Sequence, residues 1–494
     1  MINGKPIIRR LHTGVPGLDE VLGGGLPEFS FNLLAGPPGA GKTTLAHQMM
    51  FALATPEQPA IYFTVLGEPP LKMLRYQQQF DFFDDAKVHS SIHFINLAEE
   101  TASGDLDGVL QRITDEVQAH APAFVFVDSF RSVLLASHGK TNVFVTVQQF
   151  VQQLGVLMTS WQATSFLLGE YFSEDDPSPI FTVADGLIWL RQAEQGNSVV
   201  RKMEIRKMRG QPSLPGLHTF RIDHAGLRVF APPPAISAAA REPSRNIEQR
   251  VSTGISTLDA MMDGGLPVGY SLLVAGPSGS GKSILAGQFL AAGAARGEVG
   301  IIAAFEQRPN HSRGPTMGKL IDEGQVHVID TQSATLSVDE VSTLLIAAIE
   351  RLHATRVVLD SLSGFELALA PTFRADFRES LARMVSALGT TGATVLLTSE
   401  LEDRYDTLRF SPYGTAFLTD AIIVQRYIEV DSRLQRVMAV VKLRASNHSN
   451  ELRLFHIDAD GIQIDRMLVD HEGLLGGRPT RRPSPTAQPA GRND

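Results

Sequence analysis

Two glycine-rich segments of the chain bring a lysine and a hydroxyl side chain together at the end of a turn. They read Gly36-Pro-Pro-Gly-Ala-Gly-Lys42-Thr43 and Gly276-Pro-Ser-Gly-Ser-Gly-Lys282-Ser283, and both match the pattern Gly-x4-Gly-Lys-Ser/Thr. Because glycine has no Cβ, the backbone can wrap closely around an anion, with its N–H groups facing phosphate oxygens at the start of a helix. We therefore predict two phosphate-binding P-loops, with ATP as the bound nucleotide. The predicted binding residues are Gly36, Gly39, Ala40, Gly41, Lys42, Thr43 and Thr44 in the first loop and Gly276, Gly279, Ser280, Gly281, Lys282, Ser283 and Ile284 in the second.

A metal site is predicted beside each P-loop. The apolar run 124–127 ends in an aspartate, and so does the apolar run 357–359. A carboxylate at the end of a buried strand next to a P-loop holds Mg²⁺, usually through water, while the P-loop hydroxyl ligates the ion. The predicted metal ligands are therefore Thr43, Asp128, Ser283 and Asp360.

ATP hydrolysis further requires positive charge at the transferred phosphate and a carboxylate that orients the attacking water. Lys42 and Lys282 are predicted to supply the charge at the β and γ phosphates. Glu306 directly follows the apolar run 300–305, whereas Glu68 comes two residues later in the first copy than the equivalent position. The two sites are therefore predicted to differ chemically, with Glu306 as the better candidate base.

A Lys-x-Arg pair occurs late in each copy, as Lys207-Met-Arg209 and as Lys442-Leu-Arg444. Side chains two residues apart on a strand point to the same face, so each pair could clamp one polyanion. We predict that these pairs bind the phosphates of a neighbouring subunit, which would make hydrolysis depend on oligomerisation. The alternative is a solvated strand edge that charge protects from aggregation.

These residues recur because the chain contains one domain twice. Residues 13–45 and 253–285 share a pattern of threonine, leucine, aspartate, glycine and proline at a constant shift of 240 residues, from Thr13 to Thr253. A repeat this long is a domain duplication and not a solenoid. We predict a first domain over 1–230, a Pro-rich linker over 231–246, a second domain over 247–476, and a disordered Arg- and Pro-rich tail over 477–494.

The elements that position the motifs alternate between strand and helix patterns, which indicates βα units and a mostly parallel sheet. The predicted strands are 32–35, 61–65, 124–127 and 165–168 in the first copy and 272–275, 300–305, 357–359 and 394–398 in the second. A helix is predicted over 373–388, because its apolar residues recur with helical spacing. We therefore predict an α/β protein with two tandem P-loop NTPase domains, each a mostly parallel sheet flanked by helices.

Composition narrows the function classes. The chain of 494 residues is 43% hydrophobic and 20% charged, as in ordinary globular proteins, and its net charge of −9 gives no reason to expect nucleic acid as a partner. Cysteine is absent, which excludes thiol nucleophiles and zinc–thiolate or iron–sulfur sites. The N-terminal segment lacks the apolar core of a secretory signal, and no apolar run approaches the roughly 18–20 residues of a membrane span. We expect a cytoplasmic protein with no membrane partner.

With these motifs the sequence resembles the KaiC circadian clock family, within the RecA-like and DnaB-like P-loop ATPases. The resemblance runs from about Thr13 to about Asp465 and includes TGxxxLDxxxxGGLP before each P-loop and KMRG or KLRA late in each domain. It implies two RecA-like domains, a double-ring homohexamer, ATP bound between subunits, and slow ATP hydrolysis. It also implies that Glu306 is the first of the family's paired catalytic glutamates and that the late basic pairs bridge subunits.

The sequence departs from the clock members at two places. Those members phosphorylate adjacent Ser and Thr residues in the second ring, where this chain has Ala416 and Phe417. Thr415 and Thr419 are the nearby hydroxyls that could still serve. The first copy also lacks a glutamate directly at its strand end. These departures favour a KaiC-like ATPase outside a true oscillator.

We therefore expect a Mg-ATP-hydrolysing protein that forms a two-tiered ring and acts as a nucleotide-state-dependent signalling or timing ATPase with a protein partner. The first alternative is a serine/threonine autokinase of the clock type. A DNA-dependent translocase shares the fold, although both domains are acidic. A non-hydrolysing nucleotide-gated scaffold is the remaining alternative, which the missing glutamate in the first copy favours.

Overall fold

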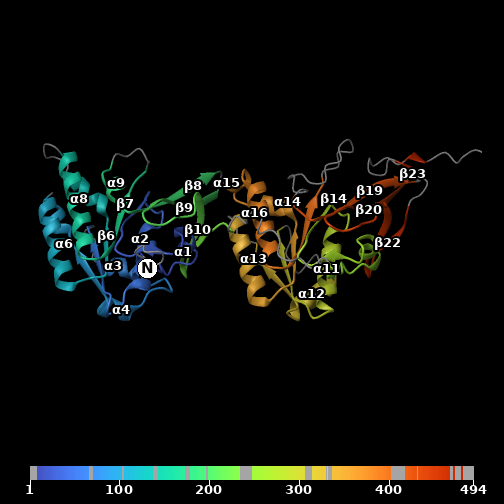
Figure 1. The fold of residues 1–494 in the computed structure, drawn as a ribbon, viewed down its shortest axis with the longest axis horizontal. Coiled ribbons are helices and arrows are strands. Elements are labelled where there is room, and N and C mark those ends of the chain that lie inside the picture. Colours follow the sequence, from blue (N-terminus) through green and yellow to red (C-terminus); the bar gives the residue numbers. More distant parts are fainter. Residues whose placement is uncertain are drawn as a thin grey trace, which may run out of the picture. The chain divides into compact units, whose positions relative to one another are not determined.

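The computed structural model describes residues 8–65, 70–102, 105–136, 143–172, 178–195, 198–233, 248–305, 314–329, 331, 336–401, 418–430, 432–467, 471–472 and 480–481. The chain divides into two compact units, Met1–Pro232 and Pro233–Asp494 (Figure 1). The predicted linker 231–246 is described only up to residue 233.

The first unit alternates strands and helices up to β8 and ends in antiparallel strands. Its strands are β1 (Arg10–Leu11), β2 (Leu26–Pro27), β3 (Phe31–Gly36), β4 (Ala60–Thr64), β5 (Ile92–Asn96), β6 (Phe124–Asp128), β7 (Thr164–Glu170), β8 (Gly186–Gln195), β9 (Ser198–Met208), β10 (Leu217–Asp223) and β11 (Gly226–Phe230). Its helices are α1 (Leu18–Leu22), α2 (Lys42–Leu53), α3 (Pro70–Gln77), α4 (Asp85–Ser90), α5 (Ala98–Ala102), α6 (Leu106–His120), α7 (Phe130–Ala136), α8 (Val143–Ser160) and α9 (Ile180–Val183).

The second unit repeats this plan. Its strands are β12 (Arg250–Val251), β13 (Leu266–Pro267), β14 (Ser271–Gly276), β15 (Gly300–Ala304), β16 (Val326–Ile329), β17 (Arg356–Asp360), β18 (Thr394–Glu400), β19 (Ala421–Val430), β20 (Arg433–Leu443), β21 (Arg453–Asp458), β22 (Gly461–Met467), β23 (His471–Glu472) and β24 (Thr480–Arg481). Its helices are α10 (Ser256–Met261), α11 (Lys282–Ala294), α12 (Gly314–Asp322), α13 (Val338–Leu352), α14 (Leu362–Ala368), α15 (Pro371–Arg374) and α16 (Phe377–Thr390).

Each unit is built on one nine-stranded sheet. The strand order is β11-β10-β9-β8-β3-β7-β6-β4-β5 in the first unit and β16-β15-β17-β18-β14-β19-β20-β21-β22 in the second. The strands from β8 to β5 are parallel, and β9, β10 and β11 extend the sheet in antiparallel fashion. This confirms the predicted α/β class with two tandem RecA-like domains. The antiparallel extension in each unit was not among the predicted strands.

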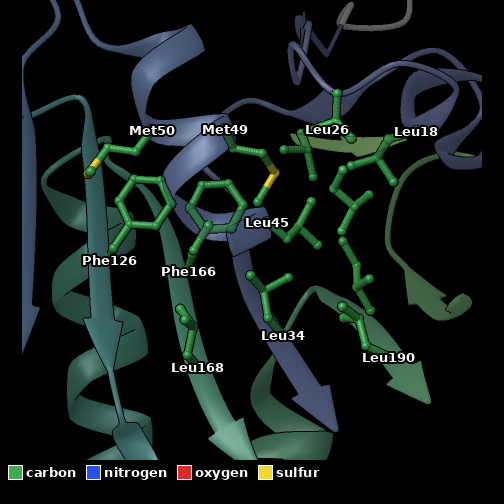
Figure 2. Packing of buried hydrophobic residues seen from close by; sticks show 14 of the residues in the cluster. Leu18, Leu26, Leu34, Leu45, Met49, Met50, Phe126, Phe166, Leu168 and Leu190 are labelled. Atoms are coloured by element: carbon green, nitrogen blue, oxygen red, sulfur yellow. The ribbon is translucent and has the colours of Figure 1, made fainter. Parts of the chain in front are cut away.

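Helices cover both faces of the parallel strands, because residues on both faces are apolar. In the first unit Leu34 and Phe126 pack against α2, as Figure 2 shows, whereas Leu33 and Val125 point to the opposite face, which α6, α7 and α8 cover. Neighbouring strand residues point to opposite faces of the sheet, so this alternation places one core on each side.

The predicted helix 373–388 is two helices in the structure. Phe373 belongs to the short helix α15, and α16 begins at Phe377. Phe377 is almost fully buried and stacks edge-on against Phe365, while Phe373 is only partly buried. The single apolar stripe therefore spans a helix break, which helical spacing alone does not reveal.

Thr480–Arg481, inside the predicted tail, pair antiparallel with His471–Glu472. Within the described residues, none of the helices is both long and apolar enough to traverse a lipid bilayer.

Candidate functional site

The first P-loop joins the last residue of β3, Gly36, to the first residue of α2, Lys42. Gly39 and Gly41 have φ of +73° and +103°, in the left-handed region that side chains disfavour. The corresponding angles in the second unit, at Gly279 and Gly281, are +75° and +105°. The two loops therefore make the same turn, with the helix N-terminus of α2 or α11 behind each of them.

The first glycine of each P-loop has a different task. A Cβ on Gly36 would lie 2.2 Å from the carbonyl oxygen of Leu190 in β8, and one on Gly276 would lie 2.8 Å from that of Gln425 in β19. Each loop thus leaves its strand directly against the backbone of the neighbouring strand. The side chains of Ala40 and Ser280 fill the interior of the turns and are fully buried.

The P-loop lysines bind the carbonyls at the base of their own loops. Lys42 Nζ donates to the carbonyl oxygens of Gly36 and Pro37, both at 2.9 Å. Lys282 Nζ makes the same two bonds, at 2.9 Å to Gly276 and 2.8 Å to Pro277. Burial lowers the pKa of Lys42, and the carboxylates of Glu170 and Asp128 oppose this shift.

The predicted metal ligands of the first unit are in direct contact. Thr43 Oγ1 donates to Asp128 Oδ2 at 2.9 Å, and the Tyr62 hydroxyl donates to the same oxygen at 2.7 Å. Burial raises the pKa of Asp128, while the hydrogen bonds from Tyr62 and Thr43 lower it. The carboxylate is therefore held in a fixed orientation at the end of β6.

In the second unit the aspartate has a different partner. Asp360 Oδ1 accepts a hydrogen bond of 2.6 Å from Thr398 Oγ1. Ser283 and its neighbour Ile284 are exposed at the start of α11.

A cavity of about 490 Å³ lies over the first P-loop. It brings together six residues predicted from the sequence, namely Gly39, Gly41, Lys42, Thr43, Thr44 and Asp128. Sequence analysis missed two charged residues that line it, Glu170 and Arg201. Glu170 ends β7 directly opposite Gly36, and Glu400 ends β18 opposite Gly276. A glutamate that closes the corresponding strand in both copies was the signal that could have identified this position.

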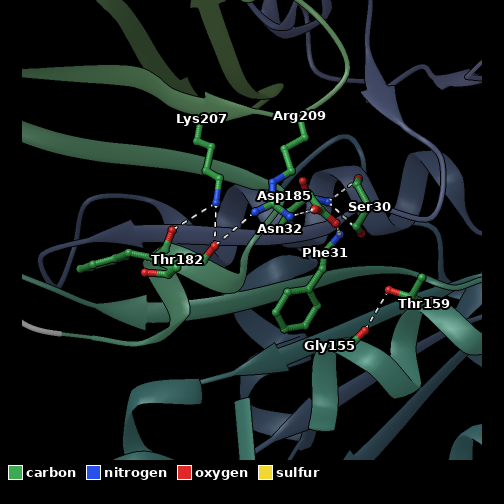
Figure 3. A network of polar contacts seen from close by, with 10 residues as sticks. Ser30, Phe31, Asn32, Gly155, Thr159, Thr182, Asp185, Lys207 and Arg209 are labelled. Carbon is green, nitrogen blue, oxygen red and sulfur yellow. Dashed lines mark hydrogen bonds and ion pairs between the residues drawn. The ribbon is translucent and has the colours of Figure 1, made fainter. Parts of the chain in front are cut away.

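The first Lys-x-Arg pair, Lys207 and Arg209, lies elsewhere, at the start of the P-loop strand (Figure 3). Lys207 Nζ donates to the Thr182 carbonyl at 2.9 Å, and Arg209 Nη1 lies 3.0 Å from Asp185 Oδ1. The other oxygen of Asp185 accepts from the backbone N–H of Phe31, the first residue of β3, at 3.1 Å. Lys207 is in β9, and Arg209 lies just past its end, so only one residue of the predicted strand pair is on the strand.

The second unit repeats the arrangement. Lys442 Nζ donates to the Thr419 carbonyl at 2.6 Å, and Arg444 Nη1 lies 3.5 Å from Asp420 Oδ1. Asp420 Oδ2 accepts from the backbone N–H of Ser271, the first residue of β14, at 3.0 Å. In both units burial lowers the pKa of the lysine, and the adjacent arginine lowers it further.

Two arginines of the β8–β9 pair lie close to the ring of a tryptophan. The guanidinium carbons of Arg206 and Arg191 lie 4.9 Å and 5.8 Å from the ring centre of Trp189. Trp189 is opposite Ala35 of the P-loop strand.

Three predicted residues cannot be placed. Glu68, Glu306 and Thr415 lie outside the described residues. The described chain stops at Val65, just after β4, and at Phe305, just after β15, and it resumes at residue 418 before β19. Thr419 is described and is fully buried.

Comparison with known proteins agrees with this geometry. A family model described as the KaiC ATPase matches residues 11–233 and again residues 251–468. The chain belongs to the KaiC family. It therefore carries two KaiC-family ATPase domains, in agreement with the resemblance seen in the sequence.

Individual members of the KaiC family are distant relatives. The chain is 26% identical to the circadian clock oscillator protein KaiC 1 of a Synechocystis species, over 96% of this chain and 92% of the relative. It is 25% identical to the circadian clock oscillator proteins KaiC of a Picosynechococcus and a Nostoc species, again over 96% of this chain and 93% and 92% of theirs. The similarity therefore extends over nearly the whole of each chain.

Proposed function

We propose that this protein binds Mg-ATP at the P-loop of each unit, hydrolyses it slowly within a ring of subunits, and alters its binding to a signalling protein with its nucleotide state. The observation that carries the proposal is the Thr43–Asp128 hydrogen bond of 2.9 Å in the cavity that Lys42 also lines. A hydroxyl, a carboxylate and an ammonium group around one cavity at a glycine turn are the groups that phosphates and Mg²⁺ require.

The residues of the first unit fit such a metal ion. Thr43 would ligate Mg²⁺ and Asp128 would hold it through water, since Asp128 lines the same cavity. Bound Mg²⁺ would neutralise charge on the phosphate oxygens. Ser283 and Asp360 are proposed for the same tasks in the second unit.

The remaining roles fall to side chains that touch the phosphates or the water. The backbone N–H groups of the two glycine turns would bind the phosphates at a helix N-terminus, and Lys42 or Lys282 would exchange its carbonyl partners for phosphate oxygens. We propose Glu306 as the group that orients water in the second unit. In the first unit Glu68 is the proposed base, and Glu170 is the carboxylate that lines the described cavity besides Asp128.

The position of the basic pairs supports hydrolysis between subunits. Phe31 and Gly36 are the two ends of β3, so Arg209 is separated from its own P-loop by the length of that strand, roughly 17 Å. Arg444 is separated from the second P-loop by β14 in the same way. We propose that Lys207, Arg209, Lys442 and Arg444 bind the nucleotide of an adjacent subunit in a homohexamer, since an arginine supplied in trans stabilises the charge of phosphoryl transfer.

Phosphate release by the full-length protein tests the assignment of the sites. We expect release to persist in Lys42→Ala and to fall strongly in Lys282→Ala and in Glu306→Gln. If neither change in the second unit reduces turnover, the second unit is not the main hydrolytic site. Loss of all release in Lys42→Ala would instead assign the activity to the first unit.

Particle size tests the ring. Light scattering with and without Mg-ATP is expected to show a nucleotide-dependent hexamer. In mixtures, Lys282→Ala subunits keep Arg444 and Arg444→Ala subunits keep an intact P-loop, so mixed rings are expected to regain part of the phosphate release that each variant alone lacks. Mixtures as inactive as the separate variants would contradict a contribution in trans.

The clock-type autokinase is a weaker proposal. Thr419 is fully buried, and its carbonyl holds Lys442, so its hydroxyl is not available to a phosphate donor in this structure. Thr415 is then the remaining candidate acceptor near β19. Radiolabelled ATP that leaves covalent phosphate on the parent protein but not on Thr415→Ala would establish the kinase, and an unlabelled parent protein would exclude it.

A further inference from the structure

In each unit the aspartate proposed to hold the metal accepts a hydrogen bond from a buried hydroxyl, and the residue that supplies this hydroxyl differs between the two units. In each unit the aspartate ends the middle one of three parallel strands, β4-β6-β7 in the first unit and β15-β17-β18 in the second. The hydroxyl comes from β4 in the first unit and from β18 in the second, on opposite sides of the aspartate strand.

In the first unit the support comes from Tyr62, which is fully buried. Tyr62 pairs with Phe126, two residues before Asp128 on the same face of the sheet, so its ring extends along the sheet toward the carboxylate. The ring is fixed in place by Phe126, stacked at 6.1 Å, and by His47, at 4.6 Å. Its hydroxyl and that of Thr43 both donate to Oδ2 of Asp128.

In the second unit the equivalent of Tyr62 has no hydroxyl. Ile302 pairs with Val358, two residues before Asp360, and therefore occupies the place of Tyr62. The hydrogen bond comes instead from Thr398, which is fully buried. Leu359 of β17 pairs with Leu397 of β18, so the next residues along the two strands, Asp360 and Thr398, lie side by side.

The exchange is reciprocal. In the first unit Val127 of β6 pairs with Leu167 of β7, so the residue of β7 beside Asp128 is Leu168. Leu168 packs into the apolar core against α2 and provides no hydrogen bond to the aspartate. Tyr62 and Leu168 in the first unit thus correspond to Ile302 and Thr398 in the second. Each aspartate accepts one hydrogen bond from a hydroxyl on a neighbouring strand.

We propose that Tyr62 and Thr398 are positioning residues, which orient Asp128 and Asp360 so that one carboxylate oxygen is held by the protein and the other faces a metal-bound water. The inference rests on the proposed function, because it assumes that these aspartates serve Mg²⁺. A charge-assisted hydrogen bond fixes the orientation of a carboxylate before the ion binds. No free energy is then lost in ordering the side chain when the ion arrives. The two units would then lose metal affinity through different single substitutions.

The test measures Mn²⁺ binding by electron paramagnetic resonance, in full-length protein with a non-hydrolysable ATP analogue. The Lys282→Ala background reports the first unit, and the Lys42→Ala background reports the second. In the first background we expect Tyr62→Phe to raise the Kd for Mn²⁺ about tenfold and Thr398→Val to leave it within twofold. In the second background the two substitutions are expected to exchange their effects.

A rescue separates orientation of the carboxylate from simple packing. Adding Leu168→Thr to Tyr62→Phe places a hydroxyl where the second unit has one, and we expect it to restore most of the Mn²⁺ affinity. Affinity for the analogue without metal is expected to stay within twofold throughout. Unchanged Mn²⁺ affinity in Tyr62→Phe, no rescue by Leu168→Thr, or an equal loss of metal-free nucleotide binding would each overturn the proposal. If the parent protein does not bind Mn²⁺ with the analogue at all, the proposed function itself fails.

Discussion

The guanidinium of Arg209 lies 3.0 Å from a carboxylate oxygen of Asp185, and the other oxygen of that carboxylate accepts the backbone N–H of Phe31. The backbone of Asp185 adds two more bonds, accepting from the N–H of Arg209 and donating to the carbonyl of Phe31. One aspartate therefore connects the basic segment after β9 to the start of the strand that ends in the P-loop. Asp420 makes the equivalent connection in the second unit.

The first prediction concerns Asp185. The substitution Asp185→Asn keeps the shape of the side chain but removes the charge that both the arginine and the Phe31 N–H contact, so we expect the free energy of unfolding to fall by about 1–2 kcal/mol. Urea unfolding followed by circular dichroism would measure this. Glu28→Gln is the control, because the Arg9–Glu28 ion pair is largely exposed on its arginine side and should contribute less than about 0.5 kcal/mol. Equal effects of the two substitutions would contradict the role given to Asp185.

The second prediction concerns the entry into the first P-loop. Gly36→Ala would bring a Cβ within 2.2 Å of the Leu190 carbonyl oxygen, which belongs to the backbone of β8 and cannot move aside without disturbing the sheet. We expect the free energy of unfolding, measured by chemical denaturation, to fall by about 3 kcal/mol or more. We also expect nucleotide binding to be lost. Gly216→Ala is the control, since Gly216 has φ of +99° but open space around its Cβ position. A cost no larger than that of the control would show that β8 does not restrict this position.

The third prediction concerns pH. His47 is fully buried against Tyr62, and burial lowers its pKa from 6.5 to about 4. Because the unfolded chain binds the proton more tightly, the stability of the first unit is intact above about pH 6.5 and falls as the pH drops toward 4, by about 3 kcal/mol in total. Thermal melts near pH 5 and pH 7 should show a smaller difference in His47→Leu than in the parent. His224→Gln, at an exposed histidine, should retain the parent's dependence. A parent-like dependence in His47→Leu would rule out His47 as its source.

The fourth prediction concerns the second unit alone. Arg356 is almost fully buried, lies 2.6 Å from Glu298, and donates to the carbonyls of Ser252 and Phe289. Glu298→Ala leaves the guanidinium without its counter-charge, and because the glutamate is partly exposed we expect a loss of about 2 kcal/mol. Glu323→Ala removes an exposed helical ion pair with Lys319 and should change stability by less than about 0.5 kcal/mol in the same denaturation experiment. Indistinguishable effects would mean that water already screens the Arg356–Glu298 pair.

The sequence was sufficient for the parts of the fold that depend on local signals. Each P-loop and each aspartate that closes an apolar strand is a short motif, and the predicted strands lie within a residue or two of β3, β4, β6 and β7. The duplication also predicted two units of the same class. The break before Phe377 was missed because two helices share one apolar stripe.

The parts that were missed depend on strand order. Glu170 reaches the P-loop because β7 is next to β3, and Arg201 reaches it because the chain returns through β8 and β9. The local sequence does not predict which strands are neighbours. The same holds for Tyr62, because its contact with Asp128 depends on the pairing of β4 with β6.

The two tryptophans of the chain give the nearly equivalent units different optical properties. Trp161 and Trp189 both lie in the first unit, and the second unit has none. Trp189 is opposite Ala35 of the P-loop strand and lies close to two guanidinium groups, whose charge affects the emission of an indole ring. Selective excitation of tryptophan therefore reports the first unit alone, so the native protein carries its own fluorescent label for following one of its two proposed nucleotide sites.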